Sequence, residues 1–394
     1  MMNITTEMAS RSLNHVGEIL CGDQVQIVHR KDSDILVLAD GMGSGVRANM
    51  LSTLTSQIFG KMLLEGASLE ECVETVIDTL PADPRTGASY STFTVLQIFH
   101  DGRGILFEYE NPGCIFIRGG ELIRIPRNEQ IISGKPINTF RFTAEVGDTF
   151  LIMSDGTIHA GLGNLMSFGW PWEDIADFAL RGHTAGQSPL REAVRICDTC
   201  NDLYNGAPGD DTTVACVHVT ARKRLHLMTG PARDKADDVR MVRNFMSGDR
   251  TVLRIVSGGT SASIVSRVLN RPMSVSMDYG DSDLPPEGFI EGVDLVTEGV
   301  LTLARVIQIL KEYAQPERID ERFFQMLDEP NPASKVARMI IEDCTEVRLY
   351  VGTAVNAAYQ NPDLPLELGL RMNLTNQLSE ALEAIGKKVE HEYY

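Results

Sequence analysis

Three acidic sites in the first 220 residues adjoin apolar runs that have the length of buried β-strands. Asp40 ends ILVLAD and Asp155 ends FLIMSD, each followed by a glycine, whereas Asp210 and Asp211 directly precede TTVACV. A buried strand holds the residue at its tip rigidly, so each carboxylate is expected to point out from a sheet edge. Carboxylates without interleaved His or Cys suit a hard divalent cation such as Mg²⁺ or Mn²⁺. A single Asp-Gly pair is more simply a turn, but three such sites together favour a metal centre.

The composition limits the partners of the chain. Its 394 residues favour two or three domains. The net charge of −18 repels nucleic acid and anionic membranes, so neither is an expected partner. No apolar run approaches the ~18 residues that a membrane span needs. The N-terminal sequence lacks the pattern of a signal peptide, so a cytoplasmic location is the expectation.

The seven cysteines follow no disulfide framework and are expected to be reduced thiols. Cys197 and Cys200 have the spacing of a redox or zinc motif. They lie in a helical pattern, however, and no second pair is nearby to complete four zinc ligands. We therefore expect them to be buried helix residues.

The first half of the chain has the pattern of an antiparallel α+β fold. Tight turns such as His100-Asp101-Gly102-Arg103 join successive strand candidates and predict hairpins. Two pairs of helical stretches interrupt the strands, which favours layers of sheet and helix over a βαβ series. The strand candidates are 34–39, 90–99, 104–109, 114–118, 121–125, 150–154 and 213–219, and the helix candidates are 46–65, 69–80, 172–180 and 189–204.

The pattern changes near residue 220. The basic run Arg222-Lys223-Arg224 and the pair Gly230-Pro231 have the composition of a linker, expected over 221–236. Beyond it, a strand, a Gly-rich loop and a helix follow one another three times, which predicts a smaller parallel α/β domain. The expected domains are therefore 1–220 and 237–394.

The order of the motifs in the first half resembles a known enzyme family. CGDQ, LADGMGSG, STFTVLQI, MSDG and GDDTTV follow one another as in the sporulation stage II protein E-type phosphatases. These form the bacterial branch of the metal-dependent serine/threonine protein phosphatases, type 2C. The resemblance covers roughly Ala9 to Val219. It implies an antiparallel β-sandwich flanked by helix pairs, with two Mn²⁺ or Mg²⁺ ions at one end.

The resemblance also implies roles for individual residues. Asp40 would bridge the two metals, and the carbonyl of Gly41 would bind one of them. Asp155 and Asp210 would bind from the facing sheet, and Asp23 would act from the outer shell through water. These residues are the candidate catalytic and metal-binding set.

One position leaves the general acid open. Met42 stands where the wider family has a histidine that is considered the proton donor, although methionine is common in the bacterial branch. His159, just after the Asp155 loop, is a candidate for that role. Its alternative is an ordinary loop histidine.

The implied reaction is hydrolysis of phosphoserine or phosphothreonine in a regulatory phosphoprotein. Two cations about 3.5–4 Å apart neutralise the phosphate and activate a water for in-line attack. Uncatalysed monoester hydrolysis is extremely slow, so paired metals are a plausible requirement. The alternative from another class is a non-catalytic phosphatase-like scaffold that binds a signalling partner.

Two other enzyme readings of the same residues are weaker. GMGSG before a helix is similar to a dinucleotide-binding loop, but its glycine spacing is incomplete and no second parallel strand follows. Cys216 and Arg222 have the Cys-x5-Arg spacing of cysteine-dependent phosphatases. The residues between them alternate as a strand, so no phosphate cradle is expected there.

The C-terminal half contains a candidate anion site at Gly258, Gly259, Thr260 and Ser261, where a strand leads into a helix. The alternative is simple helix capping. We expect this half to sense a small anionic ligand, or to dock a partner, and to act through the helix pair 46–80. The acidic loop 278–283 could bind a cation but fits a solvated turn better. A homodimer is compatible with the sequence.

Overall fold

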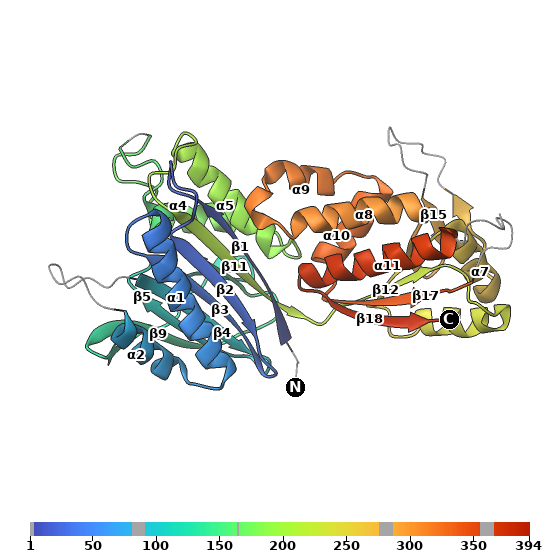
Figure 1. The fold of residues 1–394 in the computed structure, drawn as a ribbon, viewed down its shortest axis with the longest axis horizontal. Coiled ribbons are helices and arrows are strands. Elements are labelled where there is room, and N and C mark those ends of the chain that lie inside the picture. The colour runs from blue at the N-terminus through green and yellow to red at the C-terminus, as the bar shows by residue number, and fades with distance from the viewer. Residues whose placement is uncertain (1–3, 81–90, 164, 276–286, 355–365) are drawn as a thin grey trace. The chain divides into compact units, whose positions relative to one another are not determined.

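The computed structural model describes residues 4–80, 91–163, 165–275, 287–354 and 366–394 (Figure 1). The chain divides into two compact units, Met1–Ala221 and Arg222–Tyr394. In the part of the chain that the structure describes, no helix is both long and apolar enough to cross a membrane. Each unit is described by itself below.

The first unit contains two antiparallel sheets. The six-stranded sheet has the order β2-β3-β4-β5-β9-β8, and the five-stranded sheet has the order β1-β11-β10-β6-β7. The strands are β1 (Ile4–Leu13), β2 (Asp23–His29), β3 (Ser33–Gly41), β4 (Ser91–Phe99), β5 (Arg103–Tyr109), β6 (Ile115–Arg118), β7 (Glu121–Leu122), β8 (Asn128–Ile132), β9 (Lys135–Thr143), β10 (Thr149–Met153) and β11 (Thr212–Ala221).

Alternation along β3 explains how the layers pack. Leu36 and Leu38 belong to an apolar cluster with Phe150 and Ile152 of the other sheet, so these residues fill the space between the sheets. Ile35 and Val37 face the opposite way, into a cluster under the helices. Successive side chains of a strand point to opposite faces. Because both faces of β3 are covered, its sequence is a continuous apolar run.

Two helix pairs cover the outer faces of the sandwich. α1 (Gly45–Leu64) and α2 (Leu69–Thr79) pack on the six-stranded sheet, and α4 (Trp172–Gly182) and α5 (Pro189–Leu203) pack on the five-stranded sheet. Between β10 and α4 lies the one-turn α3 (Asp155–Ile158). The predicted antiparallel β-sandwich flanked by helix pairs is confirmed.

Among the described residues of the first unit, four strands escaped the sequence analysis: β1, β2, β8 and β9. Most of their residues are only partly buried, and their sequences mix polar and apolar residues. β1 pairs with β11, about two hundred residues away along the chain. A strand whose partner is distant carries little local signal, because its stability comes from cross-strand contacts.

The second unit is built on one seven-stranded sheet with the order β14-β15-β16-β13-β12-β17-β18. Its strands are β12 (Arg224–Thr229), β13 (Leu253–Ser257), β14 (Ser274–Val275), β15 (Gly288–Ile290), β16 (Val293–Thr297), β17 (Glu346–Val351) and β18 (Lys388–Tyr393). Its helices are η1 (Lys235–Asp237), α6 (Asp238–Phe245), α7 (Gly259–Leu269), α8 (Val300–Tyr313), η2 (Pro316–Arg318), α9 (Glu321–Leu327), α10 (Pro332–Glu342) and α11 (Leu366–Ala384).

The sheet of the second unit is mixed, not purely parallel. The strands in the order β16-β13-β12-β17-β18 pair in parallel, and β13, β16 and β17 are the three that the sequence predicted; β12 and β18 were not expected as strands. β15 pairs antiparallel with both β14 and β16. The short hairpin at this edge carried no recognisable strand pattern. The acidic loop 278–283 lies outside the described residues.

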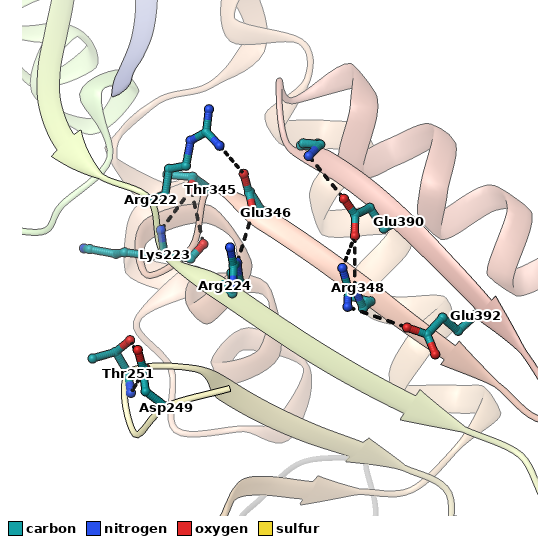
Figure 2. A network of polar contacts seen from close by, with 11 residues as sticks. Arg222, Lys223, Arg224, Asp249, Thr251, Thr345, Glu346, Arg348, Glu390 and Glu392 are labelled. Atoms are coloured by element: carbon teal, nitrogen blue, oxygen red, sulfur yellow. Dashed lines mark hydrogen bonds and ion pairs between the residues drawn. The ribbon is translucent and has the colours of Figure 1, made fainter. Parts of the chain in front are cut away.

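The expected linker is wrong in its central part. Residues 224–229 form β12, which lies between β13 and β17, and Leu225 and Met228 are fully buried. The basic residues that suggested a linker instead contact residues at the neighbouring end of β17 (Figure 2). Arg222 and Arg224 both contact Glu346, at 3.8 and 3.5 Å. Charge pairing at a strand end and a solvated linker have the same composition, so sequence alone did not separate them.

Candidate metal centre

Four predicted residues come together at one end of the sandwich. Asp40, near the end of β3, lies directly opposite Asp23 of β2 in the antiparallel register. Asp155 opens α3 just after β10, and Asp210 precedes β11, the neighbour of β10. Asp40, Asp155 and Asp210 line a cleft of about 420 Å³, whose other lining residues are His15, Gly41, Met42, Gly43, Ser44, Ser91, Thr92 and Gly209.

A buried hydrogen-bond chain joins the two sheets beneath this cleft. Ser154 donates its hydroxyl to Asp23 Oδ2 at 2.7 Å and accepts a bond from the Thr213 amide at 2.8 Å. Asp23 belongs to one sheet, Thr213 belongs to the other, and Ser154 directly follows β10 of that second sheet. The chain therefore fixes the spacing between the strand ends that carry the carboxylates.

The carboxylates repel one another in a poorly hydrated setting. Burial raises the pKa of Asp40, and the charges of Asp23 and Asp155 raise it further. Burial likewise raises the pKa of Asp23 above its usual range. Asp210 shows the same direction, from burial and then from the charge of Asp155. Each of these groups holds its charge only at a cost unless a positive charge is nearby.

The residues fit bound divalent cations. Two buried carboxylate oxygens, Asp23 Oδ1 and Asp211 Oδ2, have no hydrogen-bond partner among the described residues. No Lys or Arg is among the described residues that line the cleft. Asp155, Asp210 and His159 each offer an atom within 4.8 Å of the others. Oxygen-rich donor sets of this kind suit Mg²⁺ or Mn²⁺.

Two glycines allow the backbone to pack closely around the carboxylates. A Cβ on Gly41 would lie 2.0 Å from the carbonyl oxygen of Ala48 in α1. A Cβ on Gly156 would lie 2.2 Å from the carbonyl oxygen of Asp211. The Gly156 carbonyl accepts a hydrogen bond from the buried Tyr204 hydroxyl at 2.7 Å. Both Asp-Gly pairs thus have a packing reason for glycine that goes beyond turn formation.

Sequence reasoning missed some residues of the centre. Asp211 is buried beside the cleft and accepts a hydrogen bond from the His15 amide at 3.0 Å. Its position next to Asp210 was the available signal. His15 and Ser154 carried none, because their places depend on pairing across the two sheets. His159 lies with Nδ1 3.8 Å from Asp210 Oδ2, and its role as a general acid stays a prediction.

The two weaker enzyme readings do not fit the geometry. Cys216 and the residues after it run extended within β11, so their amides form no phosphate cradle. GMGSG follows β3, whose neighbours on both sides are antiparallel, which is incompatible with a dinucleotide-binding βαβ unit. Cys197 and Cys200 are buried in α5, as expected.

Comparison with known proteins finds one family model that matches most of the first unit. Residues 31–220 match the family model of Stage II sporulation protein E, SpoIIE. The predicted resemblance is thereby confirmed for these residues. No curated protein matches the chain.

Several solved structures are similar to the chain at low sequence identity. One is the PP2C phosphatase domain, with a fragment of the regulatory domain, of the cell fate determinant SpoIIE from Bacillus subtilis, at 18% identity and a TM-score of 0.48. The match covers 56% of this chain and 64% of that one, less than two thirds of its length. Another is a protein from Mycobacterium tuberculosis with RsbU and RsbW domains, at 18% identity, a TM-score of 0.47 and coverages of 62% and 68%. A third is RsbX in complex with magnesium, at 21% identity, a TM-score of 0.41 and coverages of 56% and 100%.

Proposed function

We propose that the first unit hydrolyses phosphoserine or phosphothreonine in a protein substrate, with two Mn²⁺ or Mg²⁺ ions held by its carboxylates. The observation that carries this proposal is the convergence of Asp40, Asp155 and Asp210 on a cleft whose described lining includes no Lys or Arg. A phosphate dianion would be repelled from such a cleft unless cations were bound first. The match to the SpoIIE family over residues 31–220 supports the same reaction class.

The position of each residue in the cleft suggests its role in binding the ions or in orienting water. Asp40, near the end of β3, would contact both ions, and the Gly41 carbonyl, Asp155 and Asp210 would supply further ligands. Asp23, held by Ser154, would orient water at the outer shell. When bound, the ions supply charge neutralisation of the phosphate and a water of lowered pKa. His159, whose Nδ1 lies 3.8 Å from Asp210 Oδ2, would be the general acid.

The test is a phosphatase assay of the full chain with an aryl phosphate and with phosphoserine and phosphothreonine peptides. We expect activity to require Mn²⁺ or Mg²⁺ and to survive thiol alkylation, because no cysteine lines the cleft in the described residues. Asp40→Asn should lower turnover by about 10²-fold or more, as expected when a group that stabilises the transition state is removed. Asp177→Asn, an exposed aspartate on α4, is the matched control.

The scaffold reading makes a different prediction for the same assay. A folded protein that binds Mn²⁺ yet hydrolyses neither substrate class would support a non-catalytic binding role. A protein that binds no divalent ion would contradict both readings of the centre. Near-normal turnover of Asp40→Asn would refute the assignment of the shared ligand.

We further infer that the second unit binds a small anion at the carboxyl ends of its parallel strands. The order β16-β13-β12-β17-β18 reverses direction at β12, and ligands of open α/β sheets bind where the order reverses. A cavity of about 720 Å³ lies at this point, at the ends of β12, β17 and β18. Its charged lining residues are Arg233, Lys235 and Arg240 with Asp234 and Asp237, and Arg240 lies 3.3 Å from Asp237. The excess of one positive charge favours an anionic ligand such as a nucleotide or phosphorylated metabolite.

The predicted anion site at Gly258–Ser261 lies at the end of the neighbouring strand β13. Gly258 has φ of +105° and precedes α7, a turn that favours glycine. The Ser261 hydroxyl accepts a hydrogen bond from the Gly230 amide at 2.8 Å, so this side chain already serves the fold. Space around Gly259 is open, with nothing within 4 Å of an added Cβ. This site therefore stays a prediction beside the cavity.

Calorimetric titration of the full chain with ATP, GTP and pyrophosphate separates the two sites. Arg233→Ala should weaken binding if the ligand lies in the cavity, and Gly259→Val should weaken it if the ligand lies at α7. Equal affinity in both variants would contradict either placement. If binding controls the enzyme, saturating ligand should change phosphatase activity by roughly 5–150-fold, an ordinary allosteric coupling. Unchanged activity would leave the second unit as a docking module.

The seven cysteines follow no disulfide framework, which supports a reducing compartment, for which we propose the cytoplasm.

A further inference from the structure

A second group of potential metal ligands lies on the outer face of the five-stranded sheet, apart from the carboxylate centre. Cys216 and His218 are two residues apart on β11, so they face the same way, and Glu192 comes from the first turn of α5. Each offers a ligand atom within 4.8 Å of the others. Cys216 and His218 lie four and six residues past Thr212, where β11 starts near the carboxylate centre. At the rise of a β-strand this is about 13–20 Å, so the two groups are separate.

Glu192 is the buried centre of this group. Its side chain is 1% exposed, and its Oε1 lies 2.6 Å from His183 Nδ1 and 3.4 Å from His218 Nε2. Its second oxygen, Oε2, is buried and has no hydrogen-bond partner among the described residues, whereas the buried His218 Nε2 has, among those residues, only the 3.4 Å contact with Oε1. Buried polar atoms are nearly always partnered, so the unpartnered Oε2 and the poorly partnered Nε2 in one group indicate that a partner is missing.

The donor types specify what that partner would be. The three residues offer one carboxylate oxygen, one sulfur and one imidazole nitrogen, the mixture that Zn²⁺ accepts and that Mg²⁺ does not favour. A dication with one carboxylate and one thiolate has no net charge, which suits a buried position. His183, held against Oε1, would orient the carboxylate in the way that histidine and carboxylate partners support zinc ligands.

We propose that Glu192, Cys216 and His218 bind a structural Zn²⁺ ion that ties α5 to β11. Binding displaces the thiol proton of Cys216 to solvent and uses the neutral ring of His218, so the step involves no oxidation. The fourth position is left to His183 or to a water. β11 starts next to Asp210 and Asp211, so the ion would brace the strand that carries one side of the carboxylate centre.

The rival reading is a metal-free ion pair. Protonated His183 and His218 flanking Glu192 would satisfy much of its charge without any ion. Burial alone would raise the pKa of Glu192, but the hydrogen bonds from His183 and His218 lower it to about 2. This reading leaves Cys216 as an ordinary buried thiol, which gives the experiment its discriminating residue.

The experiment uses the full chain, saturated with Mg²⁺ to fill the carboxylate centre and dialysed against trace Zn²⁺ or Co²⁺. We expect about one tightly held Zn²⁺ per chain by elemental analysis, as for a structural site. The Co²⁺ form should show a thiolate-to-metal charge-transfer band, which an all-carboxylate centre cannot give. Cys216→Ser should abolish the band and the bound Zn²⁺, whereas Cys200→Ser, a buried cysteine outside the group, should keep both.

The Zn²⁺ content and the Co²⁺ band of the wild-type protein test the proposal even if a variant does not fold. A folded wild-type protein with no retained Zn²⁺ and no band would overturn the proposal in favour of the ion pair. A band that persists in Cys216→Ser would place the thiolate elsewhere and overturn it as well. Glu192→Gln serves as a second variant, and it should weaken Zn²⁺ retention by about tenfold or more, the range seen when a zinc-site group is altered.

Discussion

Asp40 is the residue on which the carboxylate centre depends most. It lies opposite Asp23 across β2 and β3, and it is also close enough to Asp155 and Asp210 for their charges to raise its pKa. Its importance was predictable, because an Asp-Gly pair after an apolar run marks a strand tip. Its exact neighbours were not, because Asp155 and Asp210 come from the other sheet.

This electrostatic setting predicts how Asp40→Asn changes stability. Without metal the folded protein disfavours the ionised form of Asp40, which the unfolded chain adopts at neutral pH, and asparagine has no such cost. The substitution should therefore raise the melting temperature, by about 2–4 °C per kcal/mol for a unit of this size. With saturating Mn²⁺ the wild type should gain more stability than the variant, because the variant has lost a shared ligand. Thermal melts with and without Mn²⁺ check both directions. A variant that is less stable without metal would contradict the repulsion argument.

A second buried aspartate shows the opposite behaviour. Asp34 of β3 receives hydrogen bonds from the Thr6 hydroxyl at 3.0 Å and from His29, whose Nδ1 lies 2.8 Å away. Burial by itself would raise the pKa of Asp34, but the bonds from His29 and Thr6 prevail and lower it. A lowered folded-state pKa means that the ionised form contributes stability above the pKa of the unfolded chain.

Asp34→Asn should therefore destabilise the protein at neutral pH, by about 1–3 kcal/mol for a buried charged hydrogen-bond group. The difference from wild type should shrink as pH falls from about 4 through the lowered folded-state pKa, because both proteins are then uncharged there. Urea unfolding at pH 7 and near pH 3 measures it, with Asp177→Asn as the exposed control. A difference that stays constant with pH would show that shape, not charge, determines the loss.

At the scale of elements, the end of β3 and the first turns of α1 approach each other more closely than their sequences predict. The apolar run of β3 and the helical spacing of α1 were both predictable, and both elements lie within a residue or two of the expected bounds. Their close approach at Gly41 was not predictable. It depends on the angle at which α1 leaves the GMGSG loop, which no local pattern specifies.

Gly41→Ala tests this contact. Its Cβ would lie 2.0 Å from the Ala48 carbonyl oxygen, a backbone atom that cannot move without shifting α1. Overpacking of this kind typically costs about 1–3 kcal/mol, and the shift would also move Asp40. We expect lower stability together with weaker Mn²⁺ binding. Gly113→Ala is the control, because its Cβ would make only an ordinary 3.9 Å contact. Equal effects of the two substitutions would contradict the packing argument.

In the second unit, the sequence analysis failed to predict one central strand. The strand-loop-helix order predicted the parallel strands, but β12 was hidden inside an expected linker. Its residues Leu225 to Thr229 are buried between two strands that come later in the chain. A central strand that is recognised only by its distant partners, and is flanked by basic residues, has the local appearance of a connection.

At the scale of the whole molecule, the boundary between the units is short. β11 ends at Ala221 and β12 begins at Arg224, and the Lys223 amide donates to Thr345 Oγ1 at 3.0 Å (Figure 2). The residues after Ala221 therefore belong to the second sheet and not to a free linker. Proteolysis across 224–229 is not expected while that sheet is folded, because opening β12 would expose its buried core.

Each unit has its own core, which predicts two separable unfolding transitions in calorimetry of the full chain. Mn²⁺ should raise only the transition of the first unit, since its carboxylates belong to the native state of residues 1–221 alone. A ligand of the second unit's cavity should raise only the other transition, apart from a coupling of about 1–3 kcal/mol if it regulates the enzyme. A fragment ending at Ala221 identifies the first transition and should keep its response to Mn²⁺. A single transition that both ligands move equally would contradict the division, because it would require the two cores to unfold as one.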